Sequence, residues 1–279
     1  MLAVGRVIVV TDSSTCLPLA LVDEFAIRVL PISSYLSEEG TAPDLGGDAP
    51  AALTEEAELE ELTAANRPFV TEYLAAVEAT GYDAAVVVTP AIEFAAMYRN
   101  ASLAAGLATR PAVAIDARTA AAGQALVVLA GAQVASAGGD LDAVVAAIED
   151  ATRRVELVAS LASLEEIRRS GPVPEEVLGA AGTAAARSVF RMSHGTIEPL
   201  GATGGAEESL ETIRDAYRAS TPHGVERATV FHAGAHELAA RLGQMLGGVD
   251  FVSGFSAAMQ VHTGRGVVGA AWLPKAATP

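Results

Sequence analysis

The chain has 279 residues, of which 51% are hydrophobic and 5% aromatic, and it carries a formal net charge of −16. A chain of this length buries one large core or two moderate ones, and because compact domains usually span about 100 to 200 residues, we expect two domains. The negative charge and the lack of any run of Lys and Arg exclude a surface built to follow nucleic-acid phosphates.

Much of this charge is local. Nine acidic residues and no Lys or Arg lie between Val29 and Asn66, so this segment alone contributes −9 of the −16. Such a run is typical of a solvated acidic loop and helix face, and docking on a basic partner is the alternative.

The cysteine count and the apolar stretches indicate the cellular compartment of the protein. A single cysteine, Cys16, rules out an internal disulfide and is typical of a reducing environment. The start, MLAVGRVIVVTD, reaches an aspartate after too few apolar residues for a signal peptide. The most apolar long stretch, residues 120–139, includes Gln124, Gln133 and Ser136, which indicates a buried core helix and not a membrane span. We therefore expect a cytoplasmic protein without stable membrane insertion.

Short β-branched runs alternate with helical patterns through the first half of the chain. This alternation predicts crossover helices and a parallel sheet. The expected strands are residues 6–10, 27–32, 83–89 and 112–116, and the expected helices are residues 18–25, 68–80, 92–107, 119–137 and 141–153.

The pattern loosens after residues 152–156, which we take as the domain boundary. The prediction is thus an α/β fold of two α/β domains, residues 1–153 with a mainly parallel sheet and residues 154–279 with a mixed sheet. In the second half, Ser193-His194-Gly195 predicts the turn of a hairpin over residues 188–200. Helices at residues 206–219 and 236–246, a strand at residues 227–233 and terminal strands complete the expectation.

The last predicted strand contains the pattern G-x-G-x-x-G at Gly264, Gly266 and Gly269. A dinucleotide fingerprint requires a following helix and an acidic residue about 20 positions later. Only ten residues follow Gly269, they include no acid, and VVGAAWL is strand-like. The pattern instead predicts a Gly-rich hairpin next to His262 and Thr263, which either donate hydrogen bonds to a small anion or belong to a purely structural turn.

A second candidate site is VTDSSTCLP, directly after the first strand. Ligands of open parallel sheets gather beyond the carboxyl ends of the strands, where Asp12, Ser13 and Ser14 are expected. The alternative is ordinary capping by Ser or Thr of the helix at Pro18. The five histidines form no zinc motif, and neither G-x-S-x-G nor a Walker A sequence is present, so no motif indicates a hydrolase or a metal site.

Four blocks taken together resemble the DegV family: VTDSSTCLP, AVAIDARTAAAGQALVVLA, LASLEEIRRSG and HTGRGVVGAAW. They stand in that family's order and spacing across nearly the whole chain. The resemblance implies two α/β domains with a fatty acid in the crevice between them, no cofactor, and no catalysis by this chain itself. The family includes bacterial subunits that present a bound acyl carboxylate to a separate fatty acid kinase subunit, which makes such a kinase the expected partner.

Only some of the residues that contact the ligand head group in the family have a counterpart in this chain. The family's T-S-Q-P-type motif corresponds to AANRPF here, with Ala65 where the Thr would stand. Its S-G-T-Y-x-S-A-type motif corresponds to EFAAMYRNA, with Ala95 at the Ser. Residues 198–206, where the family's Arg-bearing segment should fall, contain no Arg.

The retained candidates for ligand binding are His262, Thr263 and Gly264 together with Ser13 and Ser14. Arg67 and Arg99 lie close to the two substituted positions and either form a bidentate clamp or point to solvent. Three hypotheses remain open: a fatty-acid carrier, the same fold with a different apolar ligand because of Ala65 and Ala95, and an enzyme with kinase-like chemistry. The last lacks a visible phosphate cradle or Mg²⁺-binding carboxylates.

Overall fold

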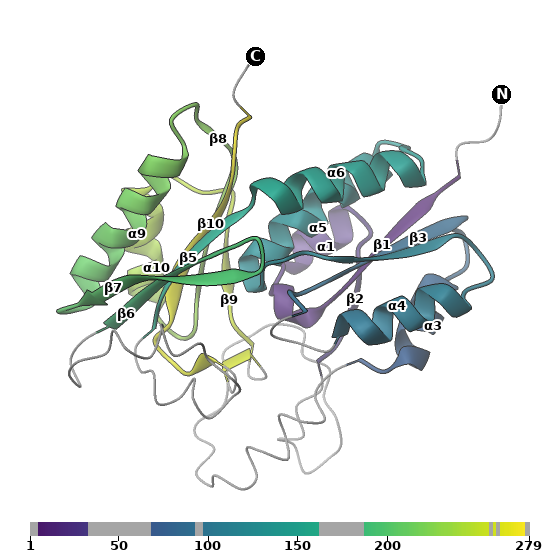
Figure 1. Cartoon of the computed structure of the whole chain (residues 1–279), viewed down its shortest axis with the longest axis horizontal. Coiled ribbons are helices and arrows are strands. Elements are labelled where there is room, and N and C mark those ends of the chain that lie inside the picture. Colours follow the sequence, from purple (N-terminus) through teal and green to yellow (C-terminus); the bar gives the residue numbers. More distant parts are fainter. Residues whose placement is uncertain are drawn as a thin grey trace, which may run out of the picture.

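The computed structural model describes residues 5–32, 68–92, 97–161, 187–256, 259–260 and 263–276, and it contains two β-sheets with helices on their faces (Figure 1). The chain forms the α/β fold expected, with a parallel first sheet and a mixed second sheet.

The first sheet has the strand order β2-β1-β3-β4, and all of its pairings are parallel. Its strands are β1 (Val7–Asp12), β2 (Arg28–Leu30), β3 (Ala84–Thr89) and β4 (Ala112–Asp116). Every residue of β1 and β3 is buried, as expected for strands covered by helices on both faces.

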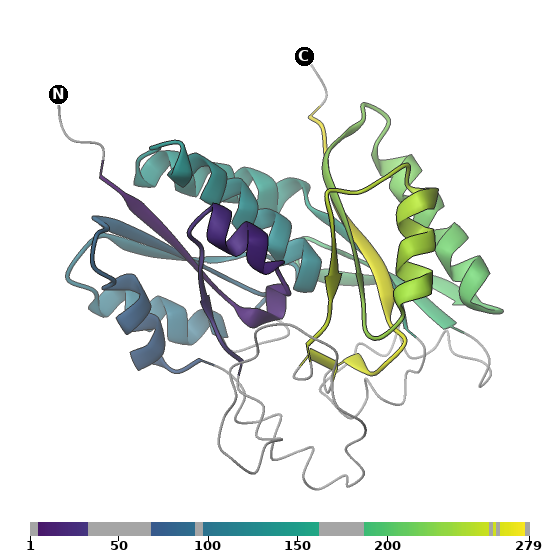
Figure 2. The ribbon, with the colours of Figure 1, turned by 180° about the vertical axis from the view of Figure 1, so that it is seen from behind.

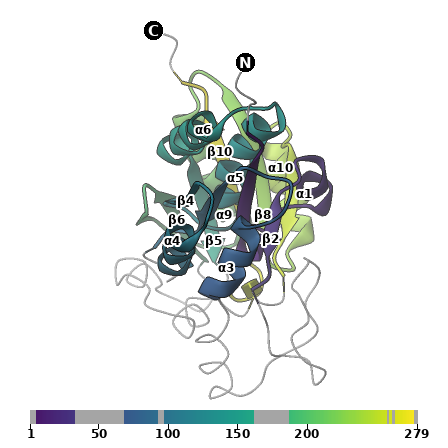
Figure 3. The ribbon, with the colours of Figure 1, turned by 90° about the vertical axis from the view of Figure 1, so that its right-hand side faces the viewer.

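Helices cover both faces of this sheet (Figures 1 and 3). On one side lie α3 (Val70–Val77) and α4 (Met97–Leu107), and on the other α1 (Leu19–Glu24), α5 (Ala121–Ser136) and α6 (Leu141–Arg154). These bounds agree with the sequence prediction to within a few residues where the chain is described, because the apolar runs and the Pro and Gly signals are local.

The second sheet has the order β7-β6-β5-β10-β8-β9, antiparallel except for the β8–β9 pair. Its strands are β5 (Glu156–Leu161), β6 (Arg187–Ser193), β7 (Thr196–Thr203), β8 (Val225–His232), β9 (Phe251–Gly254) and β10 (Val268–Pro274). The helices α9 (Ala206–Ser220) and α10 (His236–Met245) cover its outer face, opposite α5 (Figure 2).

The turn predicted between β6 and β7 is confirmed. His194 has φ +52° and Gly195 has φ +79°, and Ser193 pairs with Thr196. Two successive left-handed residues in a two-residue loop are the arrangement that suits the twist of a hairpin.

This hairpin tip contacts the loop between β4 and α5. Arg118 donates from Nε to the carbonyl oxygen of His194 at 3.0 Å, and the N–H of Gly195 donates to the carbonyl oxygen of Arg118 at 2.7 Å. These contacts join the second sheet to the first. All strands of the first sheet precede the predicted boundary at residue 153 and all strands of the second follow it; the division itself stays a prediction.

Candidate functional site

An apolar cluster runs between the two sheets around α5, which was predicted to be a buried core helix. The helix contacts β1 and β3 of the first sheet and β5, β8 and β10 of the second. Eleven of its residues are buried, and it is apolar around its whole circumference, as expected for a helix with core on all sides. The cluster includes Val9 and Leu126 as well as Phe231, Phe255 and Met259 of the second sheet and the segment after β9. The region between the sheets is therefore packed with apolar side chains around α5.

The carboxyl end of β1 is joined to α5 by buried hydrogen bonds. Gln124 of α5 donates from Nε2 to Thr11 Oγ1 at 3.1 Å and to Asp12 Oδ2 at 3.2 Å. The Ser14 hydroxyl contacts Asp12 Oδ1 and also lies 3.1 Å from Gln124 Oε1. Both Asp12 and Gln124 are fully buried. The predicted candidate Ser14 is thus part of an internal network that fixes the turn η1 (Ser13–Thr15) against α5.

Burial raises the pKa of Asp12, against the smaller opposing effect of its hydrogen bonds from Ser14 and Gln124. The direction is that of a carboxyl group removed from water, and no cation of the described residues opposes it. A raised pKa favours the neutral form, in which the carboxyl is itself a hydrogen-bond donor.

The capping alternative for this stretch is wrong for α1. The residue before α1 is Pro18, and no side chain caps this helix. The side chain that caps is that of Asp12, which accepts from the N–H of Ser14 at 3.0 Å and so stabilises η1.

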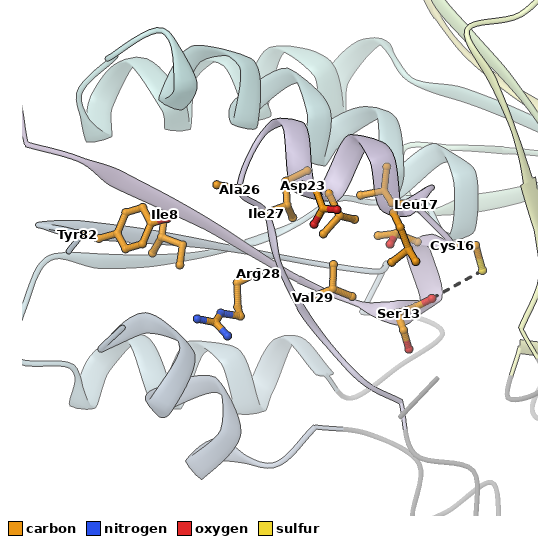
Figure 4. A pocket seen from close by; sticks show the side chains of 13 residues that line it. Ile8, Ser13, Cys16, Leu17, Asp23, Ala26, Ile27, Arg28, Val29 and Tyr82 are labelled. Carbon is orange, nitrogen blue, oxygen red and sulfur yellow. Dashed lines mark hydrogen bonds between the residues drawn. The ribbon is translucent and has the colours of Figure 1, made fainter. Parts of the chain in front are cut away.

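Ser13, in contrast, faces a pocket. Its Oγ accepts a hydrogen bond from the N–H of Ile32 at 2.8 Å, and it lines a cavity of about 520 Å³ beside β1, α1 and β2 (Figure 4). Cys16, Leu17 and Arg28 are among the other lining residues. This cavity lies at the edge of the first sheet, whereas the resemblance implied a crevice between the domains.

The segment before β10 is not the hairpin that the sequence predicted. The backbone is helical at Met259, Gln260 and Thr263, and the N–H of Gly264 donates to the carbonyl of Gln260 at 2.9 Å. Gly264 has φ +73° and ends this helical turn, a conformation that favours glycine. The Thr263 hydroxyl donates to the carbonyl of Met259 at 2.9 Å, a helical contact within the segment.

The third glycine of the pattern has a packing role. Gly269 lies in β10, and a Cβ there would come within 2.4 Å of the Phe231 ring and 2.7 Å of the carbonyl oxygen of Val158. The sequence prediction that a strand, and not a helix, follows these glycines is confirmed, which removes the dinucleotide interpretation.

One arginine beside this turn was missed. Arg187, the first residue of β6, donates to Ser160 Oγ at 2.8 Å and to the carbonyl oxygen of Gly266 at 2.6 Å. It is half-buried, burial lowers its pKa, and no carboxylate of the described residues lies within ion-pair distance of it. The sequence shows it only as one charge at a strand start, with no motif around it.

The remaining predicted site residues divide in two. Arg99 lies on the exposed side of α4. Outside the described residues lie Ala65, Arg67, Ala95 and His262, so their roles stay predictions.

Within the described ranges, no group of three His, Cys, Asp or Glu side chains could hold a metal ion. The rings of His232 and His236 lie with their centroids 4.3 Å apart. In the same ranges no helix is both long and apolar enough to cross a membrane.

A family model described as an uncharacterised protein of the DegV family matches residues 6–275. The chain belongs to the DegV family. A DegV domain-containing protein of Mycobacterium tuberculosis is 32% identical over 173 residues, 60% of this chain and 59% of the relative. This match thus spans about three fifths of the mycobacterial protein. A DegV domain-containing protein of Streptomyces coelicolor is 25% identical over 276 residues, 95% of this chain and 97% of the relative.

Solved structures share the fold of this DegV protein. A fatty-acid-binding DegV family protein from Thermus thermophilus matches with a TM-score of 0.81 at 22% identity, covering 97% of this chain and 100% of the other. DegV from Bacillus subtilis, described as a fatty acid binding protein, matches with a TM-score of 0.78 at 19% identity over the same shares. A protein from Thermotoga maritima described as revealing a fatty acid binding function also has a TM-score of 0.78, at 18% identity and the same coverage.

Proposed function

We propose that this DegV protein binds a fatty acid, with the acyl chain between its two domains and the carboxylate toward the carboxyl ends of β1 and β3. The observation that carries the proposal is the continuous apolar cluster around α5, which joins both sheets in a chain whose family members bind fatty acids. Burial of an acyl chain contributes about 0.8 kcal/mol per methylene before ordering costs are subtracted, so such a lining supplies affinity without metal or cofactor.

The ligand's polar end is then offered to a partner, for which we propose a cytoplasmic fatty acid kinase subunit. The chain itself contributes no chemistry in this proposal. Incubation of the purified chain with ATP and a fatty acid is expected to give no acyl phosphate, and product formed without a partner would overturn this part.

The binding proposal is tested by native mass spectrometry of the protein expressed in bacteria. The expected result is a co-purified mass of lipid size, which uptake of a labelled fatty acid by delipidated protein reproduces. A protein that carries no such mass and takes up no fatty acid contradicts the proposal.

A second candidate is the same fold with a neutral apolar ligand, such as an isoprenoid. The observation in its favour is Ala65 and Ala95, which replace two hydroxyl donors of the family's motifs. The double variant Ala65→Thr/Ala95→Ser separates the two: improved fatty-acid binding favours a weakened carboxylate site, and unchanged binding favours the neutral ligand.

A further inference from the structure

Among the buried hydroxyl groups that have no hydrogen-bond partner in the described part of the chain are Tyr73 Oη in α3, a helix packed on the first sheet, and Thr89 Oγ1 at the end of β3. Both side chains are 0% exposed. Buried side-chain donors are nearly always satisfied by protein, water or ligand. A ligand group is one partner that can satisfy such donors.

The two hydroxyls lie on the same face of the sheet. Tyr73 packs in one apolar cluster with Val10 of β1 and Val87 of β3 on the α3 and α4 side. Side chains alternate along a strand, so Asp12 and Thr89, two residues further on, continue these rows on the same face. Val10 pairs with Val87 in register, which places Asp12 and Thr89 opposite each other at the carboxyl ends of the two strands.

Electrostatics agree with this placement. Burial raises the pKa of Tyr73, and the ionised form of the Asp12 carboxyl raises it further, which agrees with both groups lying on the same face of the sheet. The phenol thus keeps its proton and remains a donor. The raised pKa of Asp12 favours the neutral form of this carboxyl group, and the neutral form does not repel a bound carboxylate.

The helices on this face follow the substituted motif positions closely in the sequence. Pro68 follows Ala65 by three residues, and Met97 follows Ala95 by two. Asn100 Nδ2 donates to the carbonyl of Pro68 at 3.0 Å, so α3 and α4 begin beside each other. The carboxyl ends of parallel strands are where open α/β sheets bind ligands.

We propose that the hydroxyls of Tyr73 and Thr89 bind the carboxylate of the fatty acid, in place of the Thr and Ser that the family's motifs would supply at positions 65 and 95. The proposal rests on the proposed function and names the donors of that same site. Both hydroxyls belong to residues of packed secondary structure, so the donors are fixed in place before the ligand binds.

The test uses Tyr73→Phe and Thr89→Val, which remove only the hydroxyls. Dissociation constants of the delipidated full chain are measured for oleate and for methyl oleate, which has the same chain without the charge. Loss of a hydrogen bond to a charged group is expected to weaken oleate binding about tenfold or more in each variant. Binding of methyl oleate is expected to change by less than about twofold.

Matched controls are Tyr217→Phe in α9, which covers the second sheet, and Thr152→Val in α6, where another buried hydroxyl has no partner among the described residues. Both controls are expected to leave oleate binding unchanged. If the wild type binds oleate and both test variants bind it equally well, this inference is overturned while the proposed function stands. If the wild type takes up no oleate, both fail. Thermal unfolding of Tyr73→Phe is expected at or above the wild-type temperature, because the variant removes an unsatisfied donor and no contact.

Discussion

Gln124 in α5 donates to the Asp12 carboxyl at the end of β1 at 3.2 Å, although 112 residues separate them along the chain. Since α5 contacts both sheets, this single amide connects the carboxyl end of the first sheet to the helix around which the apolar cluster forms. The strand end where we propose the carboxylate to bind is thus fixed to the helix along which we propose the acyl chain to lie.

Replacement of Gln124 by Leu is expected to destabilise the protein by about 1 to 3 kcal/mol, because Thr11 and Asp12 stay buried and lose the hydrogen bonds that the Gln124 amide donates. Urea unfolding followed by circular dichroism measures this change. Gln133→Leu, a substitution near the end of the same helix outside this network, is the control and is expected to cost less than about 0.5 kcal/mol. Equal effects of the two variants would contradict the role assigned to Gln124.

The raised pKa of Asp12 predicts a pH dependence with a definite sign. The folded protein holds the Asp12 proton more tightly than the unfolded chain, so this group's contribution to stability is complete below about pH 4 and is lost as the pH rises through the folded pKa. The variant Asp12→Asn cannot ionise and therefore does not lose this stability as the pH rises. Between pH 4 and pH 8, the free energy of unfolding of Asp12→Asn is therefore expected to rise relative to that of the wild type, by about 1.4 kcal/mol for each unit by which the Asp12 pKa is raised.

Glu78 supplies the opposite case as a control. Hydrogen bonds from the Thr109 backbone N–H and hydroxyl lower its pKa, so its contribution is present above the unfolded pKa and is lost as the pH falls through the folded one. Glu78→Gln is expected to lose stability relative to wild type at neutral pH and to converge with it in acid. A common trend in both variants would refute the assignment to individual groups.

The sequence predicts most of the first sheet because its signals are local. Each strand is a short β-branched run with both faces covered, and the turn at His194-Gly195 needs only those two residues to be recognised. The sequence prediction of a hairpin before β10 is wrong because glycines with positive φ occur both in hairpin turns and at helix ends. The hydrogen bond from the Gly264 N–H to the Gln260 carbonyl, which identifies the helical turn, is visible only in the structure.

The candidate site was predictable only in part. Asp12, Ser13 and Ser14 follow from their place after a buried strand, but the bond that engages Ser14 comes from the distant Gln124. Tyr73 looks like an ordinary core aromatic in a helix, and its hydroxyl becomes notable only once it is seen to have no hydrogen-bond partner among the described residues. Contacts between residues far apart in sequence carry no local pattern.

Gly269 should tolerate no side chain. A Cβ at this position would overlap the Phe231 ring and approach the Val158 carbonyl, a backbone atom that cannot move aside without disturbing the pairing of β5 with β10. Gly269→Ala is expected to destabilise the protein by about 1 to 3 kcal/mol through overpacking. The control is Gly106→Ala in the exposed part of α4, where nothing lies within 4 Å of the new Cβ and a gain of about 0.5 to 1 kcal/mol is expected from helix propensity. Chemical denaturation of both variants measures the contrast, and a Gly269→Ala protein as stable as wild type would contradict the packing.

The contact between Arg118 and the β6–β7 hairpin is expected to hold the second sheet against the start of α5. Arg118 has φ +51°, a strained conformation for a residue with a side chain, and its guanidinium and carbonyl oxygen both engage the hairpin tip. Arg118→Gly relieves the strain but removes the guanidinium, whereas Arg118→Lys keeps a charge and loses the paired donors.

Hydrogen exchange at the Gly195 N–H, which donates to the Arg118 carbonyl, is expected to accelerate in both variants. Arg214→Lys in α9, where the guanidinium pairs with Asp215, should leave that exchange rate unchanged. If the Gly195 N–H is protected equally in all of these proteins, the guanidinium does not contribute to the contact, and the backbone bond alone joins the hairpin to the first sheet.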